Sequence, residues 1–152
     1  MPRNVSIPAL AVSSALTLGA ANAAELISKT SAHDVPTTID RLAAAVENAG
    51  ATVFARVDHA AGAARVGAEL RPTQMLMFGN PALGTPAIQA AQTAGLDLPL
   101  RAVAYEDADG TVYLVYHDPA HLAETHGIPA DAEVLARMTG ALNNLTNAAT
   151  GE

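Results

Sequence analysis

The stretch LPLRAVAYEDADGTVYLVYH, residues 98–117, decides the fold. Its two halves, Leu98–Tyr105 and Thr111–His117, are rich in Val, Tyr and Leu, residue types that fit a half-buried strand. The residues between them, Glu106–Gly110, are acidic and end in glycine, which suits a hairpin loop that needs a positive φ. The stretch therefore predicts an antiparallel hairpin, and the sheet of the domain must contain it.

Strand and helix patterns flank the hairpin. Strands are expected at residues 25–30, 51–57 and 73–79. Helices are expected at residues 34–50, 60–68, 86–94, 118–127 and 131–148. A hairpin combined with helices that must cover one sheet face favours an α+β fold, a small antiparallel-containing sheet covered by helices on one face, over a doubly wound parallel sheet.

Two local details follow from these patterns. Strand 51–57 alternates, which places Val53, Ala55 and Val57 on one face and Thr52, Phe54 and Arg56 on the other. The segment before helix 86–94 is dense in turn-forming residues and ends in Thr85-Pro86. Thr85 is therefore expected as the cap of that helix and Pro86 as its first residue.

The N-terminal segment has the layout of a secretory signal peptide. Arg3 is followed by an uncharged stretch, residues 5–23, that is rich in Ala, Leu and Val. Ala21 and Ala23 stand at the minus-three and minus-one positions of a cleavage site. Polar residues within the stretch disfavour the alternative, an uncleaved membrane anchor. We expect a signal peptide at 1–23, a single domain at 24–148 and a frayed tail at 149–152, with a periplasmic or secreted product that is not inserted in the membrane.

Composition excludes several classes of partner and of chemistry. With 8 Lys and Arg against 15 Asp and Glu, the chain has a formal charge of -7 and no basic stripe for nucleic acid. It has no cysteine, which removes disulfides, thiolate nucleophiles and cysteine-ligated zinc. Chemistry is left to histidine, carboxylate, hydroxyl and backbone groups.

If strands 51–57 and 73–79 are antiparallel neighbours, the end of one meets the start of the other. That end of the sheet would gather a set of polar side chains: Asp58, His59, Arg71, Thr73, Glu106, Asp107 and Asp109. A histidine held between a carboxylate and an arginine can bind a small anion or move a proton. The alternative is structural, with Asp58 as a helix cap and Arg71 as an ion-pair partner of the hairpin acids.

The opposite end carries the segment from Asn80 to Thr85, with His117, Asp118 and His121 nearby. Free backbone N–H groups at the helix start would capture an anion or a carboxylate there. The alternative is a rigid strand-to-helix turn. About 30 Å of extended chain, at ~3.3 Å per residue, separates Arg71 from Asn80. One subunit therefore cannot use both ends for one small ligand, whereas a symmetric dimer can.

Three histidines fall close together but predict no metal site. His121 and His126 are five residues apart, about 140° around a helix, so they would not share a face as a zinc pair does, and His117 lies on the strand. Sequence motifs of hydrolases, Gly-x-Ser-x-Gly and His-Glu-x-x-His, are absent.

From Phe54 onward the chain resembles the bacterial Domain of Unknown Function 302 family. The resemblance is carried by FARVDHAAG (54–62), LRPTQ (70–74), FGNP (78–81), GTP (84–86), GLDLPL (95–100), YHDP (116–119) and HG (126–127). It covers roughly residues 25–128 and implies a strand–helix–four-strand–helix layout of the TATA-binding-protein-like kind, often a homodimer. It implies no established activity. The family pattern includes His59, Arg71, Thr73, Asn80 and Thr85, and departs at His117, where asparagine is common.

These observations predict that the protein binds a small anionic ligand or cofactor through His59, Arg71, Thr73, Asn80 and Thr85, with no cofactor identified. An enzyme that uses His59 as general base is one alternative, and a structural or interaction module is another. A homodimer is expected, because the sheet face with Phe54, Thr52 and Arg56 suits an interface with an apolar core and a polar rim.

Overall fold

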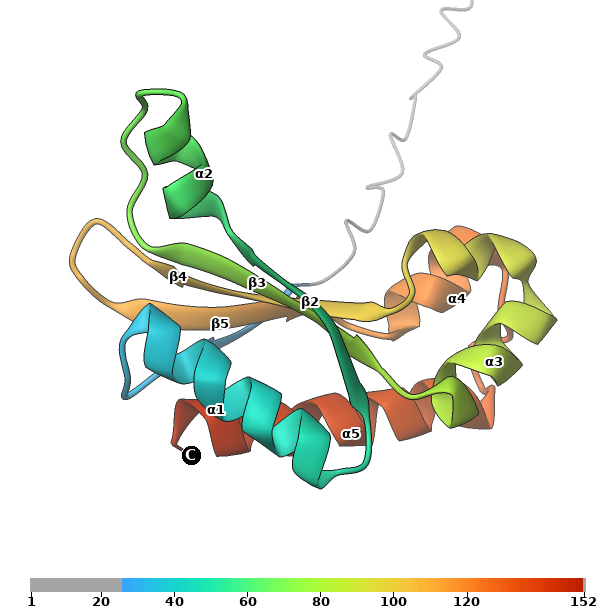
Figure 1. Cartoon of the computed structure of the whole chain (residues 1–152). Helices are drawn as coiled ribbons and strands as arrows, with labels where there is room; N and C mark the ends of the chain where they lie inside the picture. Colours follow the sequence, from blue (N-terminus) through green and yellow to red (C-terminus); the bar gives the residue numbers. More distant parts are fainter. Residues whose placement is uncertain (1–25, 152) are drawn as a thin grey trace, which may run out of the picture.

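The computed structural model describes residues 26–151 (Figure 1). The expected signal peptide at residues 1–23 lies outside them. One five-stranded sheet, in the order β1-β5-β4-β3-β2, has every neighbouring pair antiparallel. Its strands are β1 (Leu26–Thr30), β2 (Thr52–Asp58), β3 (Thr73–Gly79), β4 (Leu100–Glu106) and β5 (Val112–His117). The expectation of an α+β fold with an antiparallel sheet is confirmed.

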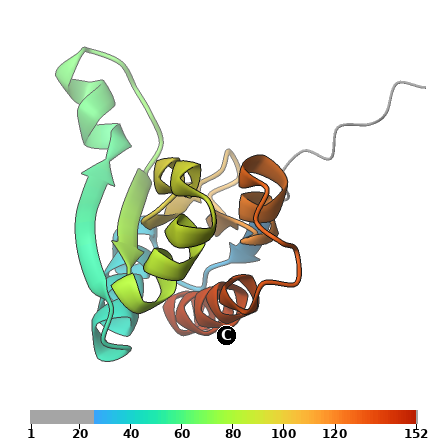
Figure 2. The same cartoon turned by 90° about the vertical axis from the view of Figure 1, so that its right-hand side faces the viewer.

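The helices lie on one face of the sheet and at its two ends. They are α1 (Val35–Asn48), α2 (His59–Arg65), α3 (Pro81–Ala90), the 3₁₀ helix η1 (Gln92–Leu96), α4 (Ala120–His126) and α5 (Glu133–Thr150). Helices α1 and α5 pack side by side under the sheet, whereas α2 projects from one end as an arm (Figure 1). Figure 2 shows α3 and α4 together at the other end.

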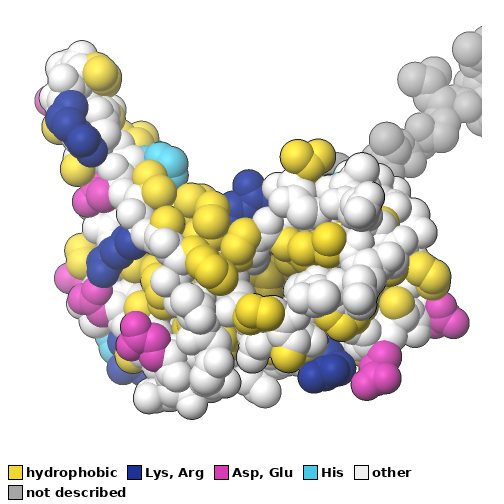
Figure 3. Space-filling model, turned by 45° about the vertical axis from the view of Figure 1, so that its right-hand side comes forward, with side chains coloured by type: hydrophobic (Ala, Val, Ile, Leu, Met, Phe, Trp, Pro, Cys, Tyr) yellow, Lys and Arg dark blue, Asp and Glu magenta, His cyan; other side chains and the backbone are white. Residues whose placement is uncertain are grey.

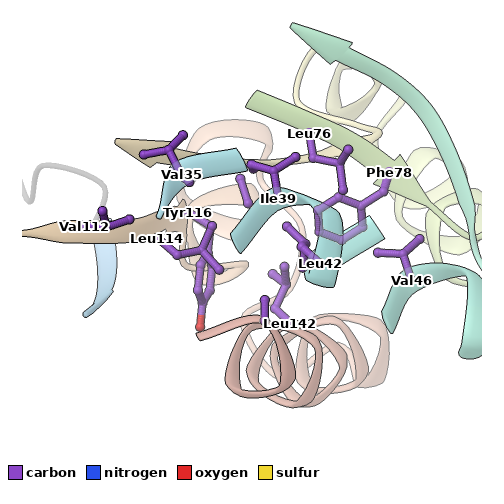
Figure 4. Close-up of a cluster of buried hydrophobic side chains, with 13 residues drawn as sticks. Val35, Ile39, Leu42, Val46, Leu76, Phe78, Val112, Leu114, Tyr116 and Leu142 are labelled. Carbon is purple, nitrogen blue, oxygen red and sulfur yellow. The ribbon is translucent and has the colours of Figure 1, made fainter. Parts of the chain in front are cut away.

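The main core forms where α1 and α5 meet the sheet. Asp34 caps α1 by accepting a 2.8 Å hydrogen bond from the backbone N–H of Thr37. Spacing of three and four residues then buries one stripe of α1 against the sheet. Figure 4 shows this cluster, whose members include Val35, Ile39, Leu42, Val46, Leu76, Phe78, Leu114, Tyr116 and Leu142.

The predicted hairpin is β4–β5. Glu106 pairs with Val112, and Asp107 fixes the loop between them, because its Oδ1 accepts bonds of 2.9 Å from the backbone N–H groups of Asp109 and Thr111. Gly110 supplies the positive φ of +80° that the loop requires. The hairpin therefore forms for the reasons its sequence predicts.

The alternation expected along β2 is wrong, because the strand contains a bulge. Pairing moves from Val53↔Phe78 to Ala55↔Met77, so Phe54 is an extra residue without a partner on β3. Val53 therefore packs toward the core, while Ala55 and Val57 share the opposite face with Met77 and Met75. Arg56 points to the α1 side, where it bonds Asp40 and Gln74. The face proposed for a dimer from Phe54 and Arg56 does not exist as one surface.

Two helix boundaries also differ from the expectation. Helix α3 begins at Pro81 with Asn80 as its cap, so Thr85 and Pro86 lie inside the helix. Pro81 already provides the proline that the first position favours. Helix α5 continues to Thr150, and Ala149 and Thr150 are buried, where the sequence predicted a frayed tail. The backbone N–H of Ala32 donates to the Thr150 carbonyl and secures that end.

A second, smaller core lies at the α3–α4 end. It is built from Ala87, Ala94, Leu122, Ile128, Leu135 and Met138. Helix α5 contributes to both cores, through Met138 to the smaller one and through Leu142 to the main one.

Candidate functional site

An apolar cleft opens where the main core meets the smaller one. It has a volume of about 520 Å³ and lies between the start of α3, the start of β2, the end of β3, the segment 98–100 and α5. Its walls are mainly hydrocarbon, from Phe54, Phe78, Leu83, Ile88, Leu98, Pro99, Leu100, Met138 and Leu145. A concave, largely apolar site of this size is typical of a pocket for a small molecule.

The cleft has few polar side chains and, within the described chain, no charged one on its walls. Asn80 and Thr85 reach it from α3, and Asn144 reaches it from α5. Thr85 and Asn144 are exposed, while Asn80 is half-buried. The site therefore offers hydrogen bonds at a small number of places on an otherwise apolar surface.

The start of α3 gives no free backbone donors to an anion. Asn80 Oδ1 accepts from the N–H of Ala82 at 2.9 Å, and the Asn80 carbonyl accepts from Leu83 and Gly84 at 2.9 Å each. Pro81 has no N–H. The backbone N–H groups of the first turn are therefore all bonded to Asn80, and none is left to bind an anion as expected for this segment.

The bulge in β2 places Phe54 in the cleft. An extra residue in one strand bends it and turns the side chain out of the regular alternation. The Phe54 ring is 53% exposed and reaches toward Gly79, at the end of β3. An exposed aromatic side chain beside an apolar cleft is a ready contact for a ligand.

The His59 end of the sheet is assembled as the antiparallel topology predicts. Asp58 pairs with Gln74, and the guanidinium Nε of Arg71 donates to the carbonyl of Glu106 at 3.1 Å. Thr73 donates its hydroxyl to the carbonyl of Arg71. His59 is the first residue of α2 and is exposed. Of the five candidates, then, the structure brings Asn80 and Thr85 together in the cleft and leaves His59, Arg71 and Thr73 at the opposite end of the sheet.

A histidine and carboxylate cluster lies near the cleft. His126 Nε2 donates to Asp97 Oδ2 at 2.8 Å, and His121 Nε2 lies 3.7 Å from the same oxygen. Arg101 bonds Asp97 Oδ1 at 3.0 Å, and the rings of His117 and His121 stack. The bond from His126 is the largest cause that holds the pKa of Asp97 below its usual value of 3.8, aided by the charges of His121, His126 and Arg101 against the effect of burial.

Two kinds of feature are absent from residues 26–151. Their histidine and carboxylate side chains form no group of three or more that is arranged to hold a metal ion. No helix in that range is both long and apolar enough to cross a bilayer.

Sequence reasoning missed most of the cleft. Gly84, Ile88 and Met138 line it from two helices that are distant in the sequence, and their spacing looks like that of ordinary core residues. Asp97 was also missed: it lies in the GLDLPL motif of the family resemblance, but nothing in that motif indicates its histidine partners. Both features depend on how helices pack, which no local pattern records.

The chain is similar in sequence to two curated proteins of Brucella. "Fluoride-specific ion channel FluC 1" of Brucella suis biovar 1 (strain 1330) is 45% identical over 129 residues, which cover 84% of this chain and 50% of that protein. The protein of the same name from Brucella abortus biovar 1 (strain 9-941) is also 45% identical, with 84% and 47% covered. This chain thus spans about half the length of the curated relatives it matches.

A solved structure shares the fold. The "uncharacterized conserved protein DUF302 from Bacillus stearothermophilus" superposes with a TM-score of 0.74 at 20% identity, over 82% of this chain and 97% of that one. The family described as "Domain of unknown function DUF302" matches residues 27–145. These residues are most of the chain, and they include all five strands from Ile27 onward. The chain belongs to the DUF302 family.

Proposed function

We propose that this domain binds a small, mainly apolar molecule in the cleft between α3, α5, the start of β2 and the end of β3. The observation that carries the proposal is the cavity of about 520 Å³, walled by hydrocarbon side chains with Asn80, Thr85 and Asn144 at its polar points. Removal of apolar surface from water contributes about 25 cal/mol per Å², so such a site favours hydrophobic ligands.

The geometry supports an uncharged ligand over an anion at this site. The described walls include no Lys, Arg or His side chain, and the first turn of α3 has no unused N–H group. A charge placed there would lose its hydration without a partner. The curated relatives are named as fluoride channels, so fluoride is the anion to compare with an apolar probe.

The test uses the uncharged dye 1-N-phenylnaphthylamine, whose fluorescence rises in apolar surroundings. The substitution Gly84→Leu would fill the cleft, because Gly84 lines it and the space around a Cβ there is open. Gly140→Leu is the matched control, since Gly140 is also a helical glycine with open space but does not line the cleft. We expect saturable binding by the wild type and Gly140→Leu, and at least a tenfold loss, about 1.4 kcal/mol, in Gly84→Leu.

Additions of sodium fluoride at constant ionic strength complete the test. We expect fluoride to leave the dye bound, and His59→Ala to bind the dye as the wild type does. If Gly84→Leu binds the dye as tightly as the control, the cleft is not the site. If fluoride displaces the dye from the wild type, the cleft accepts an anion and the proposal of an uncharged ligand is wrong. If fluoride raises the melting temperature of the wild type but not that of His59→Ala, the anion proposal at the His59 end replaces this one.

We also propose that the chain forms a homodimer through the sheet face opposite α1 and α5. Register places Val57, Met75, Val103 and Val115 in one row across that face, with the stacked pair Tyr105 and Tyr113 beside it. Figure 3 shows hydrophobic side chains gathered in the hollow between the α2 arm and the α3–α4 end. An apolar sheet face left open to water favours association with a second copy.

A further inference from the structure

Asn80 lines the cleft, and its side-chain oxygen is engaged in the cap of α3. Oδ1 accepts the N–H of Ala82 at 2.9 Å, which fixes which end of the amide is oxygen. The nitrogen Nδ2 therefore carries two N–H donors, and neither has a hydrogen-bond partner among residues 26–151. Since the cap engages Oδ1 and holds the side chain in one orientation, Asn80 presents two N–H donors at a fixed position at the start of α3.

The other polar groups of the cleft are less constrained. Thr85 and Asn144 line it from α3 and α5 but are exposed, and neither makes a recorded hydrogen bond within the described chain. A hydroxyl or an unrestrained amide can rotate to donate or to accept. Asn80 is therefore the residue expected to select the polar group of a ligand, because the helix cap fixes the orientation of its side chain.

Resting on the proposed function, we propose that the ligand is an uncharged hydrophobic molecule with a carbonyl oxygen, which Asn80 Nδ2 recognises as a hydrogen-bond donor. A hydrocarbon of the same shape would leave the Asn80 donors without a partner when it covers them, and this costs affinity. A carboxylate would reach the same donors but would lose its hydration against walls that carry no charge.

The experiment compares three ligands in displacing 1-N-phenylnaphthylamine from the full chain. 2-Nonanone supplies a carbonyl, 2-methyl-1-nonene has a methylene group in place of the oxygen, and nonanoate carries the charge. Asn80→Asp is the decisive variant, because aspartate keeps the acceptor that caps α3 and removes both N–H donors. Gln89→Glu is the matched control, because Gln89 is an exposed amide on the same helix that does not line the cleft, and melting temperatures of the variants check that the fold is intact.

We expect the wild type to bind the ketone about tenfold more tightly than the alkene. Asn80→Asp should abolish that ratio while it still binds the alkene, and Gln89→Glu should keep the ratio. Equal affinity for ketone and alkene in the wild type, an unchanged ratio in Asn80→Asp, or tighter binding of nonanoate than of the ketone would overturn this inference while the apolar cleft still stands. If neither the ketone nor the alkene displaces the dye, the proposed function fails with it.

Discussion

His126 Nε2 donates a 2.8 Å hydrogen bond to Oδ2 of Asp97, and so ties α4 to the segment that leads into β4. His126 is only 4% exposed, and its Nδ1 pairs with the hydroxyl of Thr93 at 3.1 Å. The residues directly after Asp97, 98–100, form one wall of the cleft. The bond therefore fixes the position of that wall from outside the cleft.

Replacing Asp97 by Asn should destabilise the fold at neutral pH by about 1–2 kcal/mol, because hydrogen bonds to a charged group contribute more than those to a neutral one. The pKa of Asp97 is lower in the folded state than in the unfolded state. Its contribution is therefore complete above the ordinary value of 3.8 and is lost as the pH falls through the lowered folded pKa. Urea denaturation at pH 7 and at pH values below 3.8 measures both effects.

Asp131→Asn, an exposed carboxylate with no hydrogen bond or ion pair to residues 26–151, serves as the control for that series. A difference between Asp97→Asn and the wild type that stays constant into the acid range would contradict the role given to the charge of Asp97.

Replacing Pro86 by Ala should stabilise the protein by about 2 kcal/mol. Proline inside a helix removes a hydrogen bond and costs ~3 kcal/mol, while its rigidity in the unfolded chain returns about 0.4–1 kcal/mol. Thermal unfolding measures the change as a rise of several degrees. Pro81→Ala is the control, because the first helical position needs no N–H, and no stabilisation is expected there.

Replacing Phe54 by Ala should weaken dye binding in the cleft and change stability by less than about 1 kcal/mol, since the ring is half exposed. Phe78 also lines the cleft but is buried in the main core, so Phe78→Ala should cost about 3–5 kcal/mol. Chemical denaturation together with dye titration separates the two effects. A large loss of stability in Phe54→Ala would show that the ring supports the fold.

Sedimentation equilibrium should give twice the chain mass at micromolar concentration. Met75→Glu places a charge in the middle of the open sheet face and should shift the population to monomer. Ala44→Glu, on the exposed side of α1, should leave the dimer intact. A wild-type chain that stays monomeric would contradict the proposed homodimer.

Much of the fold can be predicted from local chemistry. Asp34 and Gly50 mark the two ends of α1, and the acidic loop with Gly110 marks the hairpin, because caps and turns depend on a few neighbouring residues. The bulge at Phe54 could not be predicted, since pairing with β3 decides it. Asn80-Pro81 and Thr85-Pro86 are both suitable pairs of cap and first helical residue, and local chemistry does not choose between them as the start of α3.

The candidate site could likewise be predicted only in part from the sequence. The family resemblance singled out Asn80 and Thr85, and both line the cleft. The chemistry expected of them was anion capture, which assumed unused N–H groups at the helix start. The remaining walls come from hydrocarbon side chains. These side chains line a cavity only because no other part of the domain packs over them, and a local sequence pattern does not show this.

Helix α5 passes through both hydrophobic cores, with Leu135 and Met138 in the smaller and Leu142 and Ala149 in the main one. The two cores are otherwise built from different helices, and the cleft lies along their boundary. Cooperativity of unfolding thus depends heavily on one helix, and a molecule bound at the boundary would add contacts to both sides at once. Occupancy of the cleft would therefore make the two cores unfold more nearly as one unit.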